Sequence, residues 1–563
     1  MNKHFIKLLI LVFIFVFGGC LKVMESDKFR TLEIPERKLK QIETLDLESM
    51  KADDQEGSAA TIQPPAELML TLEEVRLITL ENNLGLNAEL ISPTIAAENV
   101  RAVEAAKYAI VFNAGITHAK NDSPNINKEI VGALGNTKVV TSINGVKSDQ
   151  TNLNMGVSIP LQTGGSINFD LNDNLGKYYG DDQVVNGLII EGDTDRYSTP
   201  LSFSVSQPLL KGAGKREFMH GIRLAKYNQS SVSAATKLAI INVLTAADSA
   251  YWDLYKKRKV LEVRQKQYSL AQVQLEKAKR MVDAGQSPQV EVLRAEAGLA
   301  SQLSTIIAAE NDLRKSQRNL KFIMNKPELS VDGPTVLLPH TDADPFYSAF
   351  DSDKLVSYAI DNRMELLQLE IDIAKNLSEI ASLRNAGLPE LNFQYRYQVN
   401  GLGTSRSDAY ELLTDKDYEN HMLGLNLRYP FGNKAAKSNL LASLYQRRQK
   451  LASIQDKEAN IQQEVLNALD SLETTWQQIL ANRQSSILQG RLYQAELKQF
   501  EVGTRTSTEV LEAQASFADS QSAEYTALAN YQIALIDLAK ATGTLLGAAK
   551  VQWAPEVPDV GVK

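Results

Sequence analysis

The sequence predicts a mainly α-helical protein that also carries β-strands, arranged as two helix–strand–strand–helix repeats. The stretch Glu217–Val282 is almost free of glycine and proline, as expected of one very long helix, and Lys434–Phe500 has a similar length. Shorter segments ahead of both stretches alternate apolar with polar or small residues, which is typical of β-strands. The segments Met281–Ala297 and Phe500–Ala515 match when residue 285 is set against residue 503, which indicates an internal repeat.

The N-terminus has the features of an export signal. Met1–Lys7 is basic, and the apolar run Leu8–Phe17 is too short for a hydrocarbon core, which needs about 20 residues. Small residues then precede Cys20, the only cysteine of the chain. We predict a signal peptide over 1–19 and, because this arrangement resembles a bacterial lipoprotein motif, acylation of Cys20 by a chain such as palmitate. An ordinary secretory signal with an incidental cysteine is the alternative.

Residues 20–68 are polar and charged, without a sustained period, and are expected to form a lipidated N-terminal tether. After the signal, no segment reaches 18 uninterrupted apolar residues. We therefore expect no membrane-spanning helix there, so any membrane crossing must use strands.

The first repeat is expected over 69–326. Thr71-Leu-Glu-Glu74 has the form of a capping box and starts helical sequence that continues to about Tyr108. Strands follow within about 109–210, with polar loops at 120–150 and 174–198. The candidate strands are 110–117, 152–161, 166–172 and 201–210.

Alternation of this kind suits the wall of a transmembrane β-barrel, with lipid on one side and water on the other. A half-buried soluble sheet alternates in the same way, so the pattern alone leaves both possibilities open. The strand region of the first repeat is long enough for two hairpins, which leaves its number of strands open.

A helical hairpin is expected over 215–325. Apolar or small residues recur every seven positions between Ala247 and Val282, as in a coiled coil. About 65 residues at 1.5 Å each give a rod of roughly 100 Å, longer than any compact domain core. Gly285 ends the rod, a returning helix is expected from about 287 to 323, and 327–352 is expected to link the repeats.

The second repeat, expected over 353–547, repeats this order. It starts with a helix over 353–386, continues with strands within about 390–430 around a polar loop at 400–420, and ends with a helical hairpin over 434–547 that turns at Gly503. Residues 548–563 are the C-terminal tail.

Composition argues against several classes of function. The net charge is −8 and no run of Lys or Arg is longer than four residues, which argues against nucleic-acid binding. Five scattered histidines and one cysteine give no metal-ligand cluster, and no Ser/His/Asp arrangement has local support. Gly212-Ala-Gly214-Lys215 lacks the flanking residues of a phosphate-binding loop. We expect no enzyme activity, no cofactor and no metal.

The motif Phe500-Glu-Val-Gly-Thr-Arg-Thr, followed by Glu509-Val-Leu-Glu512-Ala, resembles the inter-helix tip of the TolC family of outer-membrane efflux channels. The sequences around Pro208 and Pro430 resemble the strand-to-helix junctions of that family. The resemblance covers about 70–547. It implies a trimer with an α-helical periplasmic barrel and an outer-membrane β-barrel, built with one strand hairpin per repeat.

The resemblance also implies roles for tip residues. Glu291, Phe500 and Arg505 match the positions of a periplasmic gate, although Phe500 lacks the hydroxyl of the family's tyrosine. Two further sets complete the expected sites: an acidic ring at the constriction, formed by Glu509 and Glu512, and an adaptor-docking tip, formed by Gly285, Gly503 and Thr504. Without the resemblance, the charged residues would be ordinary helix surface and the glycines ordinary turns.

The expected function is a trimeric outer-membrane exit channel of a tripartite efflux pump or a type I secretion system. Its partners would be a periplasmic adaptor, an inner-membrane pump and outer-membrane lipid. A periplasmic coiled-coil adaptor and a structural lipoprotein without a pore are the alternatives. The transported substrate and the class of pump stay open.

Overall fold

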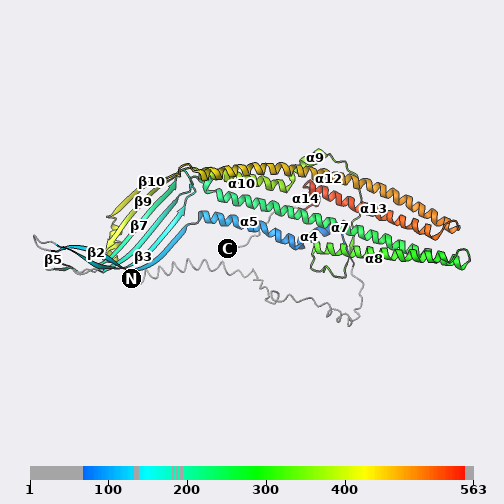
Figure 1. Ribbon diagram of the computed structural model, residues 1–563, viewed down its shortest axis with the longest axis horizontal. Helices are drawn as coiled ribbons and strands as arrows, with labels where there is room; N and C mark the ends of the chain where they lie inside the picture. The colour runs from blue at the N-terminus through cyan, green and yellow to red at the C-terminus, as the bar shows by residue number, and fades with distance from the viewer. Residues whose placement is uncertain (1–66, 132–137, 180–182, 186–187, 191–193, 552–563) are drawn as a thin grey trace, which may run out of the picture. The chain divides into compact units, whose positions relative to one another are not determined.

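The computed structural model describes residues 67–131, 138–179, 183–185, 188–190 and 194–551 (Figure 1). All of them fall within one unit of the chain, 66–563. The predicted signal peptide, Cys20 and nearly all of the predicted tether lie outside the described residues, and so does most of the predicted tail.

The longest helices form two antiparallel hairpins, as the sequence predicts. The first hairpin pairs α7 (His220–Asp283) with α8 (Val290–Met324), and the second pairs α12 (Lys434–Glu501) with α13 (Ser507–Ala541). Contacts between α7 and α13 place the two hairpins side by side, with both turns at the same end (Figure 1). The 64 residues of α7 correspond to about 96 Å of helix.

Each repeat opens with a helix that is interrupted once. The helices are α4 (Leu72–Asn82) and α5 (Leu84–Tyr108) in the first repeat, and α9 (Ser352–Asn362) and α10 (Met364–Ala386) in the second. The predicted capping box is present, since Thr71 and Glu74 hydrogen-bond reciprocally at the start of α4.

The opening helices of the two repeats are interrupted at equivalent positions and in the same way. Asn83 and Arg363 both have extended backbones, and each side chain donates a hydrogen bond to a carbonyl near the end of the returning helix of its own repeat. Asn83 Nδ2 bonds Ile323 O at 2.9 Å, and Arg363 Nη1 bonds Ala541 O at 3.1 Å. The prediction of one continuous helix over 353–386 is therefore wrong, because Arg363 leaves the helical path to make this contact.

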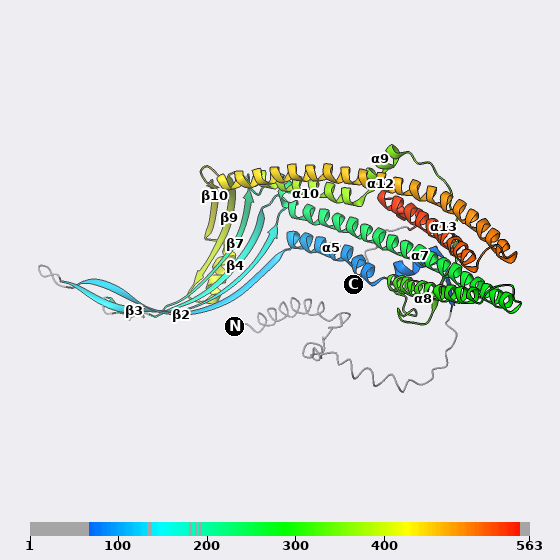
Figure 2. The same ribbon diagram turned by 45° about the vertical axis from the view of Figure 1, so that its right-hand side comes forward.

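The strands form one six-stranded antiparallel sheet in the order β10-β9-β7-β4-β3-β2 (Figures 1 and 2). Its strands are β2 (Val111–Val131), β3 (Lys138–Pro160), β4 (Ser166–Tyr179), β7 (Thr194–Pro208), β9 (Glu390–Gly403) and β10 (Glu419–Arg428). The first repeat supplies two hairpins and the second supplies one. The first repeat therefore departs from the single hairpin that the resemblance implies.

The sheet has one apolar and one polar face. Phe169, Phe203 and Tyr397 stand opposite one another on β4, β7 and β9. One residue along, Asn168 and Ser204 occupy the other face, where Asn168 also accepts a hydrogen bond of 2.7 Å from Ser158 on β3. Since side chains alternate along a strand, this register sorts most apolar and polar residues of the sheet onto opposite sides.

Three polar segments predicted as loops are partly or largely regular structure. Strands β2 and β3 stay paired up to Val131 and Lys138, which covers most of 120–150. Strands β4 and β7, with the short pair β5 (Gln183–Val185) and β6 (Leu188–Ile190), extend into 174–198. A two-stranded ribbon meets water on both faces, so its pairing leaves no apolar alternation in the sequence.

The third segment, 400–420, contains the helix α11 (Arg406–Asp415), capped by Ser405. Its Ala409 is fully buried against β9, where a side chain at Gly401 would collide with the Ala409 carbonyl. This close approach depends on tertiary contact, which the local sequence does not reveal.

The predicted linker also contributes to the core. Strand β8 (Val336–Pro339) pairs in parallel with β1 (Glu67–Leu70), the first described segment. The hydroxyl of Tyr251 on α7 donates to Leu70 O at 3.2 Å and accepts from Thr341 N at 2.9 Å, which fixes both segments to the long helix. The short helices α6 (Lys215–Phe218) and α14 (Leu545–Ala548) complete the described elements.

By length and composition alone, α7 is apolar enough to cross a membrane, although the sequence prediction expected no such helix. Its buried residues pack against α4, α5, α8, α10 and α13. A core helix of a protein meets the same criterion, and packing on this scale accounts for the apolar composition of α7.

Candidate functional site at the hairpin tips

Both hairpins turn through the same backbone motif. Gly285 and Gly503 have φ angles of 72° and 79°, in the left-handed region that favours glycine. Backbone bonds from Gln286 N to Met281 O, 2.8 Å, and from Thr504 N to Gln499 O, 3.0 Å, close the turns. A Cβ added at either glycine would meet no atom within 4 Å, so the backbone angle, and not lack of space, requires glycine.

The N-terminus of α13 is capped locally. Thr506 and Glu509 form a capping box, in which Glu509 Oε2 accepts from Thr506 N at 2.8 Å. This backbone bond, followed by the bond from Arg505, lowers the pKa of Glu509. Glu509 is therefore already bound to its own helix, which the predicted role in an acidic ring did not include.

Among the described residues, the polar partners of Arg505 all belong to the second hairpin. Its Nη1 donates to Glu509 Oε1 at 2.5 Å, its Nε donates to Gln499 Oε1 at 2.9 Å, and Glu496 Oε2 lies 3.2 Å from Nε. The bond to Glu509 and the charge of Glu496 raise the pKa of the guanidinium. The Arg505 side chain is 41% exposed, so its outer side is free to meet a neighbouring molecule.

Glu291 connects the two hairpins. Its Oε2 accepts from the backbone N–H of Ser507, the first residue of α13, at 2.9 Å, and its Oε1 accepts from Arg294 at 2.6 Å. Glu291 is 7% exposed and Ser507 is fully buried. The structure does not bring Glu291 to Arg505. It brings the carboxylate instead to the N-terminus of a helix of the other hairpin, where a negative charge is favourable.

Phe500 lies in the seam between the hairpins, 3% exposed. Lys277 of α7 sits 5.8 Å from its ring centroid and bonds Glu501 Oε1 at 2.8 Å. Lys277 is thus a second connection between the hairpins, and the sequence prediction did not include it. Its position opposite Phe500 on a separate helix gives no local sequence signal.

The outer surface of the second tip is exposed. Val502 is 79% exposed, Thr504 is exposed, and Glu512 is exposed and forms no ion pair with the part of the chain that the structure describes. The predicted tip residues therefore separate into two groups. Glu291, Phe500 and Glu509 hold the tip together, while Thr504, Glu512 and one side of Arg505 face outward.

The predicted strand-to-helix junctions lie at the opposite end of the hairpins. Pro208 is the last residue of β7, opposite Asn392, and Pro430 lies two residues beyond the end of β10. Glycines with left-handed backbones then turn the chain into the helices, Gly212 and Gly214 in the first repeat and Gly432 in the second. Proline suits these positions because it ends strand pairing.

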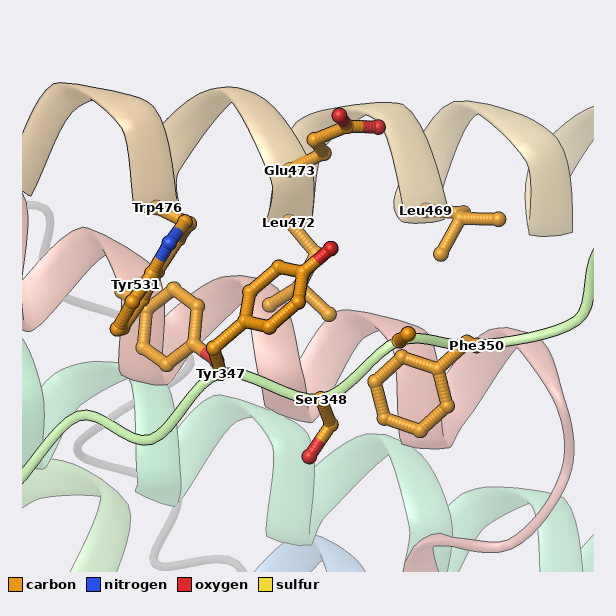
Figure 3. A pocket seen from close by; sticks show the side chains of 9 residues that line it. Tyr347, Ser348, Phe350, Leu469, Leu472, Glu473, Trp476 and Tyr531 are labelled. Carbon is orange, nitrogen blue, oxygen red and sulfur yellow. The ribbon is translucent and has the colours of Figure 1, made fainter.

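A shallow pocket of about 120 Å³ lies away from the tips, where the linker crosses α12 and α13 (Figure 3). The rings of Tyr347 and Tyr531 both lie beside Trp476, with centroids 5.5 and 5.6 Å from it. Tyr531 donates to Phe346 O at 2.6 Å, so the aromatic residues fasten the linker to the helices. Within the described ranges, no group of three His, Cys, Asp or Glu residues is placed to hold a metal ion.

Comparisons with known proteins agree with this architecture. The family model described as outer membrane efflux protein matches residues 355–544. The outer membrane protein TolC of Vibrio cholerae serotype O1 is 23% identical over 361 residues, which cover 63% of this chain and 78% of that protein. The outer membrane efflux protein BepC of Brucella suis biovar 1 is 24% identical over 329 residues, covering 56% and 67%.

Among solved structures, the open state of the Neisseria gonorrhoeae MtrE outer membrane channel superposes with a TM-score of 0.57 at 16% identity, covering 84% of this chain and 89% of that chain. These relatives are channels of the outer membrane and not enzymes, and the alternative of a periplasmic adaptor is set aside. Residues 355–544 belong to the outer membrane efflux protein family, and the chain is similar over more than half of its length to outer-membrane efflux proteins of the TolC family.

Proposed function

We propose that three copies of this chain form one continuous tube, which serves as the exit duct of a tripartite efflux pump or a type I secretion system. The observation that carries the proposal is the sheet with one apolar and one polar face, connected directly to helices of about 96 Å. An apolar outer face suits lipid and a polar inner face suits a water-filled duct. The long helices would extend that duct into the periplasm.

The chain's regions take the following places in this proposal. Residues 1–19 direct export, Cys20 carries the acyl anchor, and the segment to 68 is the tether. The repeats at 69–326 and 353–547, with the linker 327–352 between them and the tail 548–563 after them, give a trimer six similar units around the tube. Outer-membrane lipid surrounds the sheet.

The hairpin tips form the gate. Within a protomer, Glu291 and Lys277 hold the first tip to the second, and Phe500 fills the seam between them. The exposed side of Arg505 is available to a neighbouring protomer. Three copies of Glu512, with the partly neutralised Glu509, would place carboxylates near the axis and favour cations.

The outer surface of the tips is the docking site for a periplasmic adaptor. Gly285 and Gly503 fix the turns, and the second turn presents the exposed Val502 and Thr504. An exposed apolar residue on a rigid turn suits contact with the tip of another helical hairpin. The adaptor would connect the tube to an inner-membrane pump.

The test is planar-bilayer conductance of the purified protein, with and without millimolar divalent cation. We expect small cation-selective steps that divalent cations block from one side, and a higher open probability in Arg505→Ala. Glu512→Gln should weaken the block without changing the open probability. A folded trimer that conducts neither as the parental protein nor as Arg505→Ala would refute the channel and leave a structural lipoprotein.

A further inference from the structure

The two edges of the sheet end in strands that face no partner. Strands β2 and β10 are the first and last strands of the order, and the structure pairs neither one with a further strand of the described chain. In hydrocarbon, every backbone N–H and C=O group needs a hydrogen-bond partner, so an open sheet edge is not stable in a membrane. Six strands are also fewer than the eight of the smallest membrane barrels. A second chain must therefore cover each edge.

The two faces of the sheet persist on the β10 edge. Leu423, Leu425 and Leu427 are 72%, 60% and 69% exposed on one face, in register with Tyr395, Phe393 and Leu391 of β9. The alternate positions of β10 are Asn420, Met422, Gly424, Asn426 and Arg428. Apart from Met422, these residues suit a water-filled lumen.

The β2 edge shows the same division. Phe112 and Ile116 are 49% and 72% exposed and share the apolar face, opposite Val157 and Leu153 of β3. Asn113, Gly115 and Thr117 lie on the polar face. A β2 strand excluded from the membrane would have no reason to keep lipid-facing apolar residues at alternate positions.

Strand direction also permits pairing of β2 with β10. Every neighbouring pair in the sheet is antiparallel and the number of strands is even, so β2 and β10 run in opposite directions. Copies related by rotation then meet edge to edge as antiparallel neighbours. The ten residues of β10 are long enough for a membrane strand, which needs about 9–11.

From these edges we propose that β10 of one protomer pairs with β2 of the next, so that three sheets of six strands close an 18-stranded barrel. The inference rests on the proposed trimer. One hairpin per repeat, as the resemblance implies, would give 12 strands. Barrel diameter grows about linearly with strand number, so the 18-stranded barrel has about 1.5 times the diameter of a 12-stranded one. At a strand spacing of 4.8 Å and a tilt of 40°, the two diameters are roughly 36 Å and 24 Å.

The consequence is functional. The second hairpin of the first repeat widens the outer-membrane part of the duct, whereas the helical part keeps four long helices per protomer, α7, α8, α12 and α13. The sheet is then less of a constriction than the tips. Such a duct would admit bulky or polymeric cargo once the tips open.

Disulfide cross-linking in membranes tests the pairing. Cysteines are placed in pairs on the polar face, with Asn113→Cys or Thr117→Cys on β2 and Asn420→Cys or Asn426→Cys on β10. The matched control pairs Asn426→Cys with Asn168→Cys on β4, which would meet only if β2 and β3 lay outside the wall. The parental chain, with Cys20 alone, gives the background.

We expect oxidation of at least one β2–β10 pair to shift the band from the monomer to three times its mass. Images of the protein in nanodiscs should then show 18 strands. Cross-linking of the β4–β10 control within a trimer would overturn the barrel and leave the proposed function intact. Covalent species that stop at a dimer would overturn the barrel and the trimer together. A native trimer that no β2–β10 pair cross-links also counts against the barrel.

Discussion

Replacing Glu291 with glutamine should loosen the tips. The Glu291 carboxylate accepts the Ser507 N–H at 2.9 Å in a nearly buried position and lies at the N-terminus of α13. Glutamine keeps an acceptor oxygen and a similar volume but removes the charge. The substitution therefore removes the charge that faces the N-terminus of α13, together with the ion pair that Glu291 forms with Arg294 on its own helix.

The magnitude follows from two contributions. A hydrogen bond to a charged group contributes about 1.5–3 kcal/mol and a neutral one about 0.5–1.5 kcal/mol, a difference of roughly 1 kcal/mol. A negative charge at a helix N-terminus adds about 0.3–1 kcal/mol. The expected loss is about 1–2 kcal/mol per protomer, and 1.4 kcal/mol changes an equilibrium tenfold. We expect the ratio of open to closed channels to rise about tenfold if one tip opens alone, and more if three open together.

Single-channel recording measures this ratio, and the chain offers a matched control. Glu509 occupies the equivalent place in the second repeat, but its carboxylate caps its own helix. Glu509→Gln should lower the thermal stability of the second tip with a smaller effect on opening. An open probability that is the same in Glu291→Gln as in the parental protein, or equal in the two variants, would refute a gating role for the contact.

Three further changes test the packing of the structure. Gly503→Ala places a side chain at a φ of 79° and should destabilise the tip by about 1–2 kcal/mol. Gly503→Asn should destabilise it less, because asparagine tolerates a left-handed backbone. Differential scanning calorimetry compares the two variants, and equal losses of stability would argue against the backbone explanation. Asp248 is fully buried beside Arg76, and burial raises the pKa of Asp248 although the arginine lowers it. Asp248→Ala should therefore lower the free energy of unfolding in denaturant by about 3–5 kcal/mol, and replacing both Asp248 and Arg76 with apolar residues should restore most of that loss. An equal loss in the single and the double variant would refute the ion pair as the cause. Burial opposes ionisation of Glu365, but its arginine neighbour and a backbone N–H outweigh burial and lower the pKa. The stability that this carboxylate contributes is therefore complete above the unfolded pKa of about 4.3 and is lost as the pH falls through the folded pKa. Acid unfolding of Glu365→Gln should lack that loss, and a pH profile unchanged from the parental protein would contradict the assignment.

The long helices and their turns were predictable because local patterns determine them. Absence of glycine and proline, a seven-residue period and a terminal glycine are short-range signals, and α7 and α12 begin and end within a few residues of the prediction. The same applies to the capping box at Thr71 and to the strand ends at Pro208 and Pro430. The comparison of the repeats also identified equivalent positions, such as Gly285 and Gly503.

Elements that depend on tertiary contact were not predictable in this way. The polar ribbon of β2 and β3, the helix α11 and the pairing of β1 with β8 have no local period. At the tips, the sequence predicted candidate site residues but not which of them are in contact. Glu291 and Arg505 carry opposite charges, and only the structure shows that each is bound elsewhere.

The different fates of Glu291 and Glu509 follow from one difference between the repeats. Thr506 supplies the backbone N–H and the hydroxyl that hold Glu509, whereas the equivalent residue of the first repeat is Pro288, which has neither. The carboxylate of Glu291 is therefore free to reach out of its own hairpin, and it satisfies the buried N–H of Ser507. Because Pro288 cannot cap α8 as Thr506 caps α13, the Glu291 carboxylate instead joins the first hairpin to the second.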